Sequence, residues 1–245
     1  MKNKNFSLTS YKYLLNVINS SKKKVITFEE FFRGNNGIIM RHDIDFCPVR
    51  ALHIAKIEYD FNIKSTFFVM LNSKLYSLKK QKYFQSIKKI ISLGHFIGLH
   101  FDPNYYFSKS DELDFFCNKE CESLEKLIKK KIKIISFHRP AKKFIGRKTK
   151  IASRYHTYMP QLIKDIKYCS DSEGKWRFDD PVKLIKDNTL KSIQLLTHPI
   201  WWTTPGELSS GEKINLHLKG QRKEKKQEAA LNCKPYKSFL KSNPL

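Results

Sequence analysis

Apolar runs of strand length alternate with helical patterns along most of the chain. The runs cover residues 37–41, 65–70, 96–100, 132–137, 166–169 and 192–197. Between them lie amphipathic patterns, clearest at 82–93 and 111–130, in which apolar residues recur at helical spacing. Such alternation predicts repeated βα units around a parallel sheet or barrel.

The length of 245 residues suits one well-buried α/β domain. We expect an N-terminal helical extension over residues 1–36, with an amphipathic helix at 10–18, and a barrel over 37–204. The composition beyond Pro205 changes to Gly, Ser and Lys, which predicts a basic, peripheral tail over 205–245. Residues 219–226 can bind a polyanion, but an exposed tail is the interpretation we favour.

The chain is strongly basic, with 47 basic and 23 acidic residues and a formal net charge of +24. A field of that sign attracts phosphates, nucleic acid or anionic lipid. The lysines are scattered beside apolar helical faces, which is typical of a solvated surface. No recognition helix, stacking repeat or zinc finger accompanies the charge, so we expect no dedicated nucleic-acid binding. Peripheral association with an anionic membrane stays open.

The N-terminal sequence and the cysteines indicate in which cellular compartment the protein is expected. The amino terminus lacks the apolar core of a secretory signal, and no apolar stretch is long enough for a transmembrane segment. The five cysteines form an odd number at no zinc-knuckle or disulfide spacing, which predicts reduced thiols. We therefore expect a cytoplasmic protein.

Two carboxylates directly follow the first apolar run, in Arg41-His42-Asp43-Ile44-Asp45. Residues two apart on a strand point the same way, so Asp43 and Asp45 are expected to face one cavity. Acids at the carboxyl end of a buried parallel strand are where such folds present catalytic groups. A divalent cation on one carboxylate would relieve the repulsion between them. A helix N-cap is the alternative for Asp45, but capping does not explain Asp43.

Four later segments supply partners for this pair of acids. Hydrolysis of an amide or ester needs an activated water, a base, a charge for the oxyanion and an acid for the leaving group. A strand-end histidine is often only a packing residue, yet beside paired acids a neutral imidazole is a suitable zinc ligand. Together the segments predict a metal hydrolase. The first segment ends at His100. The other three are Phe137-His138-Arg139-Pro140, Ser170-Asp171-Ser172 and Leu196-Thr197-His198-Pro199.

In this order, over residues 41–202, the five segments resemble the motifs of the polysaccharide deacetylases, the NodB-homology group or carbohydrate esterase family 4. Within that family the chain resembles the His-Asp-x-Asp subgroup. The resemblance implies an α/β fold, a distorted (β/α) barrel. It also implies a metal-dependent hydrolase, with Zn²⁺ the expected metal. The expected substrate is an N-acylated sugar or a glycan intermediate, which can carry a phosphate or a lipid, and the expected product is a free amine and acetate or a similar acid.

The resemblance also implies a role for each matched residue. Asp43 is the general base, Asp45 and His100 bind the metal, Arg139 pairs with the base, His198 is the general acid and Asp171 is the partner of His198.

One position departs from the family pattern. Asn104 stands where a second metal-binding histidine is usual. Catalytic zinc normally has three protein ligands and one open position, so another ligand is needed. Asp102 is the nearest replacement in sequence, and the Asn104 amide oxygen and His138 are the other candidates.

Substrate contacts are expected from His138, Asn104 and Trp176. Tryptophan stacks on sugar rings, although it is equally common in protein cores. Two further functions stay open: an amidase acting on a non-sugar C–N bond, and a catalytically disabled module that holds an anionic glycan. The second depends on the missing ligand at Asn104.

Overall fold

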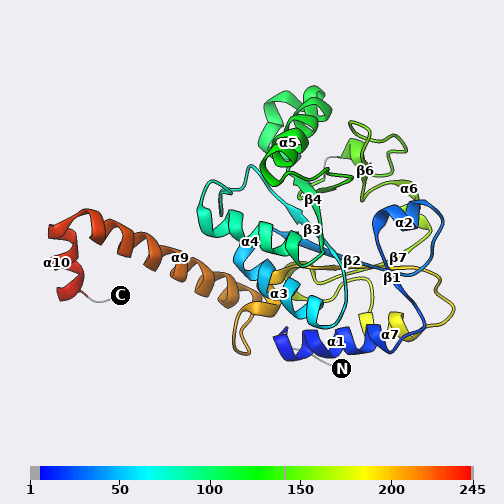
Figure 1. The fold of residues 1–245 in the computed structure, drawn as a ribbon, viewed down its shortest axis with the longest axis horizontal. Coiled ribbons are helices and arrows are strands. Elements are labelled where there is room, and N and C mark those ends of the chain that lie inside the picture. Colours follow the sequence, from blue (N-terminus) through cyan, green and yellow to red (C-terminus); the bar gives the residue numbers. More distant parts are fainter. Residues whose placement is uncertain (1–5, 141, 244–245) are drawn as a thin grey trace. The chain divides into compact units, whose positions relative to one another are not determined.

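The computed structural model describes residues 6–140 and 142–243 (Figure 1). These fall into two compact units, which divide between Thr203 and Thr204. Within the described residues one sheet has eight strands in the order β6-β5-β4-β3-β2-β8-β7, with β1 paired to β2 off this path. The strands are β1 (Val25–Ile26), β2 (Ile38–Ile44), β3 (Thr66–Val69), β4 (Phe96–Phe101), β5 (Ile134–Phe137), β6 (Tyr155–His156), β7 (Lys167–Ser170) and β8 (Ile193–Thr197).

Helices follow most strands. In the first unit they are α1 (Leu8–Asn19), α2 (Phe28–Phe32), α3 (Pro48–Asp60), α4 (Gln81–Ser92), α5 (Leu113–Ile128), α6 (Pro160–Lys164), α7 (Pro181–Lys186) and α8 (Pro199–Thr203), with 3₁₀ helices η1 (Pro103–Glu112), η2 (Lys142–Phe144) and η3 (Ser172–Gly174).

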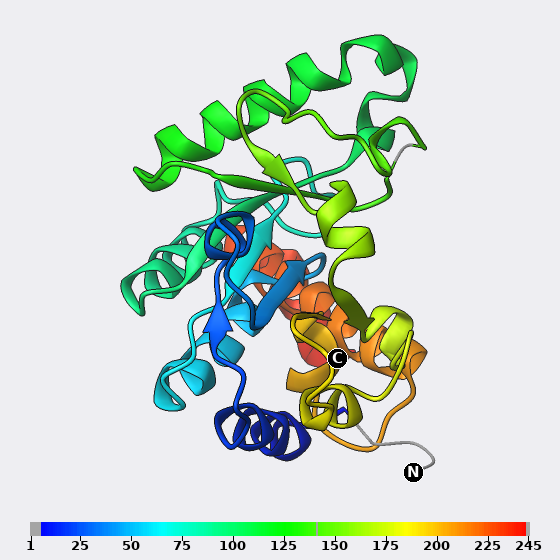
Figure 2. The ribbon, with the colours of Figure 1, turned by 90° about the vertical axis from the view of Figure 1, so that its right-hand side faces the viewer.

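The expected fold class is confirmed. Neighbouring strands run parallel, and the sheet curls into a half-barrel with helices around it (Figure 2). The described strands leave the barrel open between β6 and β7, at the two ends of the strand order. A distorted barrel of this kind brings the carboxyl ends of β2, β4, β5 and β8 to one edge.

Each of the six predicted apolar runs overlaps a strand. The largest difference is at β2, which continues to Ile44 because its polar residues are buried and stay in register with β3 and β8. The helices expected at 10–18, 82–93 and 111–130 appear as α1, α4 and α5. Strands β1 and β6 have two residues each, too few for a periodic signal.

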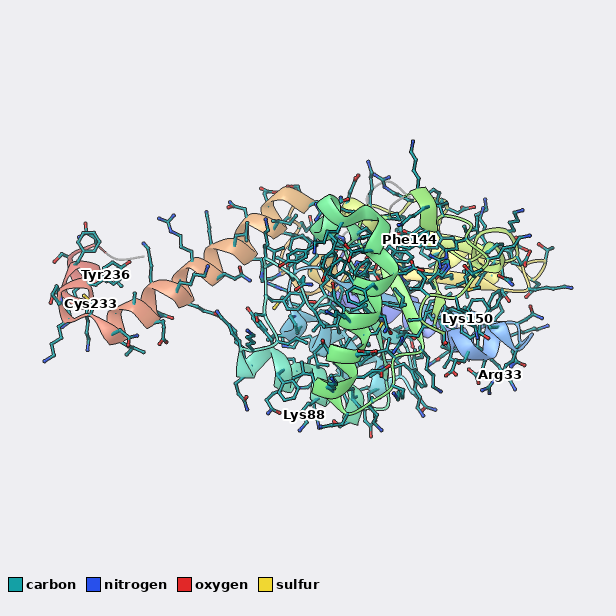
Figure 3. The ribbon with its side chains drawn as sticks, turned by 90° about the horizontal axis from the view of Figure 1, so that it is seen from above. Arg33, Lys88, Phe144, Lys150, Cys233 and Tyr236 are labelled. Atoms are coloured by element: carbon teal, nitrogen blue, oxygen red, sulfur yellow. The ribbon has the colours of Figure 1, made fainter. Side chains whose placement is uncertain are left out.

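The second unit consists of α9 (Ser210–Asn232) and α10 (Lys234–Ser242), where the sequence predicted only a tail. A capping box between Ser209 and Glu212 starts α9, and its Lys-, Glu- and Gln-rich sequence has high helix propensity. Cys233 separates the two helices, and Tyr236 lies in the first turn of α10 (Figure 3). No helix among the described residues has the length and apolar character needed to cross a bilayer.

The outward side of β2 contacts a hydrogen-bonded carboxylate on α3. Glu58 of α3 is fully buried and accepts hydrogen bonds from the Tyr11 hydroxyl at 2.7 Å and from the Ser65 hydroxyl. Its Oε1 also lies 2.8 Å from His42 Nε2, and His42 Nδ1 lies 2.6 Å from the hydroxyl of Thr197 on β8. This network connects α1 and α3 to the two strands that carry the candidate catalytic groups.

Tyr11→Phe tests this network. Removing the hydroxyl leaves a buried carboxylate with one donor fewer, so we expect the free energy of unfolding to fall by ~1–3 kcal/mol. Urea unfolding followed by circular dichroism measures the change. Tyr59→Phe, at a residue that is 58% exposed, is the matched control and should change stability by less than ~0.5 kcal/mol. Equal stability of the two variants would contradict the role given to Tyr11.

A second buried carboxylate, Glu120 on α5, is bound by two neutral donors. Asn72 Nδ2 and the Tyr106 hydroxyl each donate to Glu120 Oε1 at 2.9 Å. Burial raises the pKa of Glu120 to about 7, against the opposing effect of these two hydrogen bonds. Ionised Glu120 therefore destabilises the fold near neutral pH.

Glu120→Gln tests the cost of this burial. Between the usual pKa of 4.5 and about 7, the folded protein retains a proton that the unfolded chain releases, so stability falls as pH rises through this window. Once Glu120 is fully ionised, above pH 7, the free energy of unfolding has fallen by ~3 kcal/mol in total. We expect Glu120→Gln to be more stable than the parent at pH 8 and to lose that advantage near pH 5, as measured by urea unfolding. Glu122→Gln, on the exposed side of α5, should show no such pH-dependent difference.

Candidate metal centre and active site

Three ligand-type side chains meet at the carboxyl edge of the sheet. Asp45 follows the last residue of β2, His100 lies near the end of β4, and His138 directly follows β5. Asp45 Oδ1 lies 3.1 Å from His100 Nε2 and 3.2 Å from His138 Nδ1, and one ligand atom from each residue falls within 4.8 Å of the others. The backbone N–H of His138 donates to the Phe101 carbonyl at 2.9 Å, which holds His138 beside β4.

These three groups fit a divalent cation. Asp45 Oδ1 is shielded from solvent and, within the part of the chain that the structure describes, makes no regular hydrogen bond despite the two nearby imidazoles. Ligands of a tetrahedral ion with bonds of about 2.0–2.2 Å are about 3.3–3.6 Å apart, and Asp45 Oδ1 lies 3.1 and 3.2 Å from the two imidazole nitrogens. One carboxylate and two imidazoles leave a fourth position for water or substrate. Burial opposes ionisation of Asp45, but the adjacent imidazoles of His100 and His138 bring its pKa well below the usual range.

The residue that the structure brings to Asp45 and His100 is not the one that the sequence favoured as third ligand. Asp102 Oδ2 pairs with the Arg139 guanidinium, and Asp102 Oδ1 accepts the backbone N–H of Asn104 at 3.1 Å. Asp102 is the N-cap of η1, so both of its oxygens are engaged away from Asp45. The structure instead brings His138, named above as another candidate, to Asp45 and His100.

Arg41 is the partner of Asp43. Its Nε and Nη2 donate to the two oxygens of Asp43 at 2.9 and 2.8 Å, and Nη2 also donates to the hydroxyl of Ser136. The guanidinium lies 5.1 Å from the centre of the Phe68 ring, which Gly98 accommodates because a Cβ there would stand 2.4 Å from the ring. Burial opposes the ionisation of Asp43, but Arg41 brings its pKa below the usual value.

The resemblance gave this partnership to Arg139, which the structure pairs with Asp102. Sequence reasoning missed Arg41, although a signal was present. Arg41 stands two residues before Asp43 on the same strand, so both side chains point to the same face.

His198 and Asp171 form the expected pair. Asp171 is fully buried and accepts the His198 backbone N–H, and its Oδ1 lies 2.6 Å from His198 Nδ1. Trp202, which the sequence analysis did not single out, donates its indole N–H to Asp171 Oδ2 at 2.7 Å. Burial opposes protonation of His198, but Asp171 raises its pKa to about 9. His198 Nε2 lies 3.7 Å from Asp45 Oδ2, so the protonated ring faces the metal centre.

A cleft of about 570 Å³ opens beside Asp45. Of the residues expected to contact substrate, His138 and Asn104 line it. Trp176 packs instead against Phe6 and Trp202, with ring centres 5.8 Å apart in each case, and is not among the residues that line the cleft. Further polar and aromatic lining comes from Asn72, Ser73, Lys74, Phe46 and Tyr105.

Metal binding separates His138 from Asp102 as the third ligand. Zinc titration of metal-free protein by calorimetry should give about one site per chain, and His138→Ala should weaken it by roughly 100-fold or more. Asp102→Ala should retain most of the affinity because its oxygens point to other partners. His53→Ala, at an exposed histidine on α3, is the matched control. A larger loss in Asp102→Ala than in His138→Ala would reverse the assignment.

Known proteins that resemble this chain were found by comparison of structures. The sequence matches no family model and no curated protein. A family 4 carbohydrate esterase from Bacillus anthracis has 16% identity and a TM-score of 0.44, with 76% of each chain covered. A chitin deacetylase from the fungal pathogen Colletotrichum lindemuthianum has 13% identity and a TM-score of 0.42, over 75% of this chain and 81% of that one.

A mutant of a carbohydrate esterase family 4 pseudoenzyme from Bacillus anthracis, with restored enzymatic activity, has 12% identity and a TM-score of 0.41. The match covers 78% of this chain and 64% of the pseudoenzyme, so the chain spans less than two thirds of that protein. Two of these three structures are of the family whose motifs the sequence resembles. Likeness at these values assigns no activity to this chain, whose chemistry follows from its own residues.

Proposed function

We propose that the chain is a zinc-dependent hydrolase that removes an acetyl or similar acyl group from an N-acylated sugar. The observation that supports it is the meeting of three kinds of group at one edge of the sheet. Asp45, His100 and His138 offer a cation site, Asp43 is held ionised by Arg41, and His198 is held protonated by Asp171.

The roles of the side chains follow from their charge and position. A bound divalent cation supplies Lewis-acid chemistry, because it polarises the acyl carbonyl and makes water more acidic. Asp43, whose Oδ2 lies 3.5 Å from His100 Nε2, borders the cation site and can accept the proton of the attacking water. His198 approaches the same site through Nε2 and can donate a proton to the departing nitrogen.

An amide is the bond that best suits this arrangement. An amine leaves an amide only after its nitrogen gains a proton, and a histidine with a pKa of about 9 carries that proton at neutral pH. The cleft has polar amides at Asn72 and Asn104 and an exposed aromatic ring at Tyr105, a mixture that suits a sugar. This lining favours a sugar over a wholly apolar amide. Because His138 lies beside Asp45 and His100, Asn104 in place of the usual histidine does not by itself favour an inactive binding module.

Acetate release from N-acetyl sugars in the presence of Zn²⁺ tests the proposal. We expect the wild type to release acetate, and His198→Asn to lower kcat by about 10²–10⁴-fold, the usual effect of losing an acid catalyst. Zinc affinity should persist in that variant because His198 is not among the three proposed ligands, Asp45, His100 and His138. His53→Asn is the matched control. No acetate release from any N-acetyl sugar by the zinc-loaded protein would refute the proposal.

A further inference from the structure

The site contains two arginines in different settings. Arg41 is buried and bound to both oxygens of Asp43, so its guanidinium is committed to the base. Arg139 lies directly after His138, and its side chain is 60% exposed. Because Arg41 already binds Asp43, Arg139 can have another role at the mouth of the site.

Arg139 is anchored from behind and opens onto the cleft. Asp102, which is 6% exposed, binds one of its terminal nitrogens, and the Asn104 backbone N–H holds the other oxygen of Asp102. A guanidinium has five N–H donors in a planar fork, so one carboxylate contact fixes its direction without occupying it. The same cleft is lined by Lys74, an exposed residue from the segment after β3.

The charge of the cleft favours an anion. Among its lining residues the carboxylates of Asp45 and Asp102 balance the cations of Lys74 and Arg139, two against two. A divalent cation at Asp45 would therefore leave an excess of two positive charges. The chain as a whole carries +24, which adds to the attraction of anions toward this cleft.

We propose that Arg139 and Lys74 form an anion subsite, which binds a carboxylate or phosphate group carried by the acylated sugar next to the bond that is cleaved. This inference deepens the proposed function and rests on it for the acylated sugar as the ligand. The Arg139 fork contacts two oxygens of the anion while Lys74 supplies a second charge across the cleft. If Arg139 only fastened Asp102, neutral and anionic sugars would bind alike.

Binding measurements test the subsite independently of turnover. Calorimetry on the full chain, metal-free and zinc-loaded, would use N-acetylglucosamine, N-acetylglucosamine 6-phosphate and N-acetylmuramic acid as neutral, phosphate and carboxylate probes. We expect at least one anionic probe to bind the zinc-loaded protein about tenfold or more tightly than the neutral one, and the metal-free protein, whose cleft has no excess of charge, to show the same preference to a smaller extent. Arg139→Gln should remove most of that preference and Lys74→Gln part of it. The stronger of the two anionic arms identifies phosphate or carboxylate as the preferred group.

The matched control is Arg147→Gln. Arg147 also forms an Arg–Asp pair, with Asp114, but does not line the cleft, so its loss removes one positive charge without touching the subsite. This variant should keep the full preference for the anionic probe. Circular dichroism and thermal unfolding of each variant establish that the fold is retained.

The outcomes separate the subsite from the proposed function. An anion preference that Arg139→Gln abolishes, without acetate release from any probe, supports the subsite and refutes the deacetylase. Acetate release with equal binding of neutral and charged probes refutes the subsite and leaves the deacetylase standing. A loss in Arg147→Gln as large as in Arg139→Gln also overturns the subsite, because the effect would then come from net charge.

Discussion

The placement of two carboxylates at the carboxyl end of β2, one on the strand and one directly after it, is the constraint on which the site depends. Asp43 and Asp45 are two residues apart, and ionised carboxylates at that spacing repel each other in a region with little water. Arg41 neutralises Asp43 on one side, and the imidazoles of His100 and His138 surround Asp45 on the other. Separate compensation keeps both acids ionised, as the proposed roles of Asp43 in proton transfer and of Asp45 in cation binding require.

Side chains along β2 alternate between its two faces, and the face opposite Asp43 has a structural role. His42 lies between the two members of the Arg41–Asp43 pair and points outward to Glu58, which α1 reaches through Tyr11. Thr197, the last residue of β8, joins the same network through His42 Nδ1. Because His198 follows Thr197, the network sets the position of the strand end that presents the acid. The N-terminal helix is thus part of the support of the site.

Sequence patterns predicted the parts of the fold and site that depend on periodicity. The apolar runs gave the strands because a buried parallel strand needs apolar residues on both faces. The His198–Asp171 pair was expected from motif order and forms. The third ligand was not predictable in this way, because Asp102 and His138 both lie just past a strand end. Their directions depend on backbone detail: the turn into η1 makes Asp102 an N-cap, whereas a hydrogen bond to Phe101 holds His138 beside β4.

The same detail explains the exchange of roles between the two arginines. A guanidinium on a strand, two residues from its carboxylate, is held in place by the sheet and costs little further ordering when it binds. Arg41 has this advantage, and Ser136 and Phe68 restrict it further. An arginine on the loop after β5 would have to order that loop to do the same work. Because Asp43 is already paired with Arg41 on β2, Arg139 lines the cleft, where it is paired with Asp102.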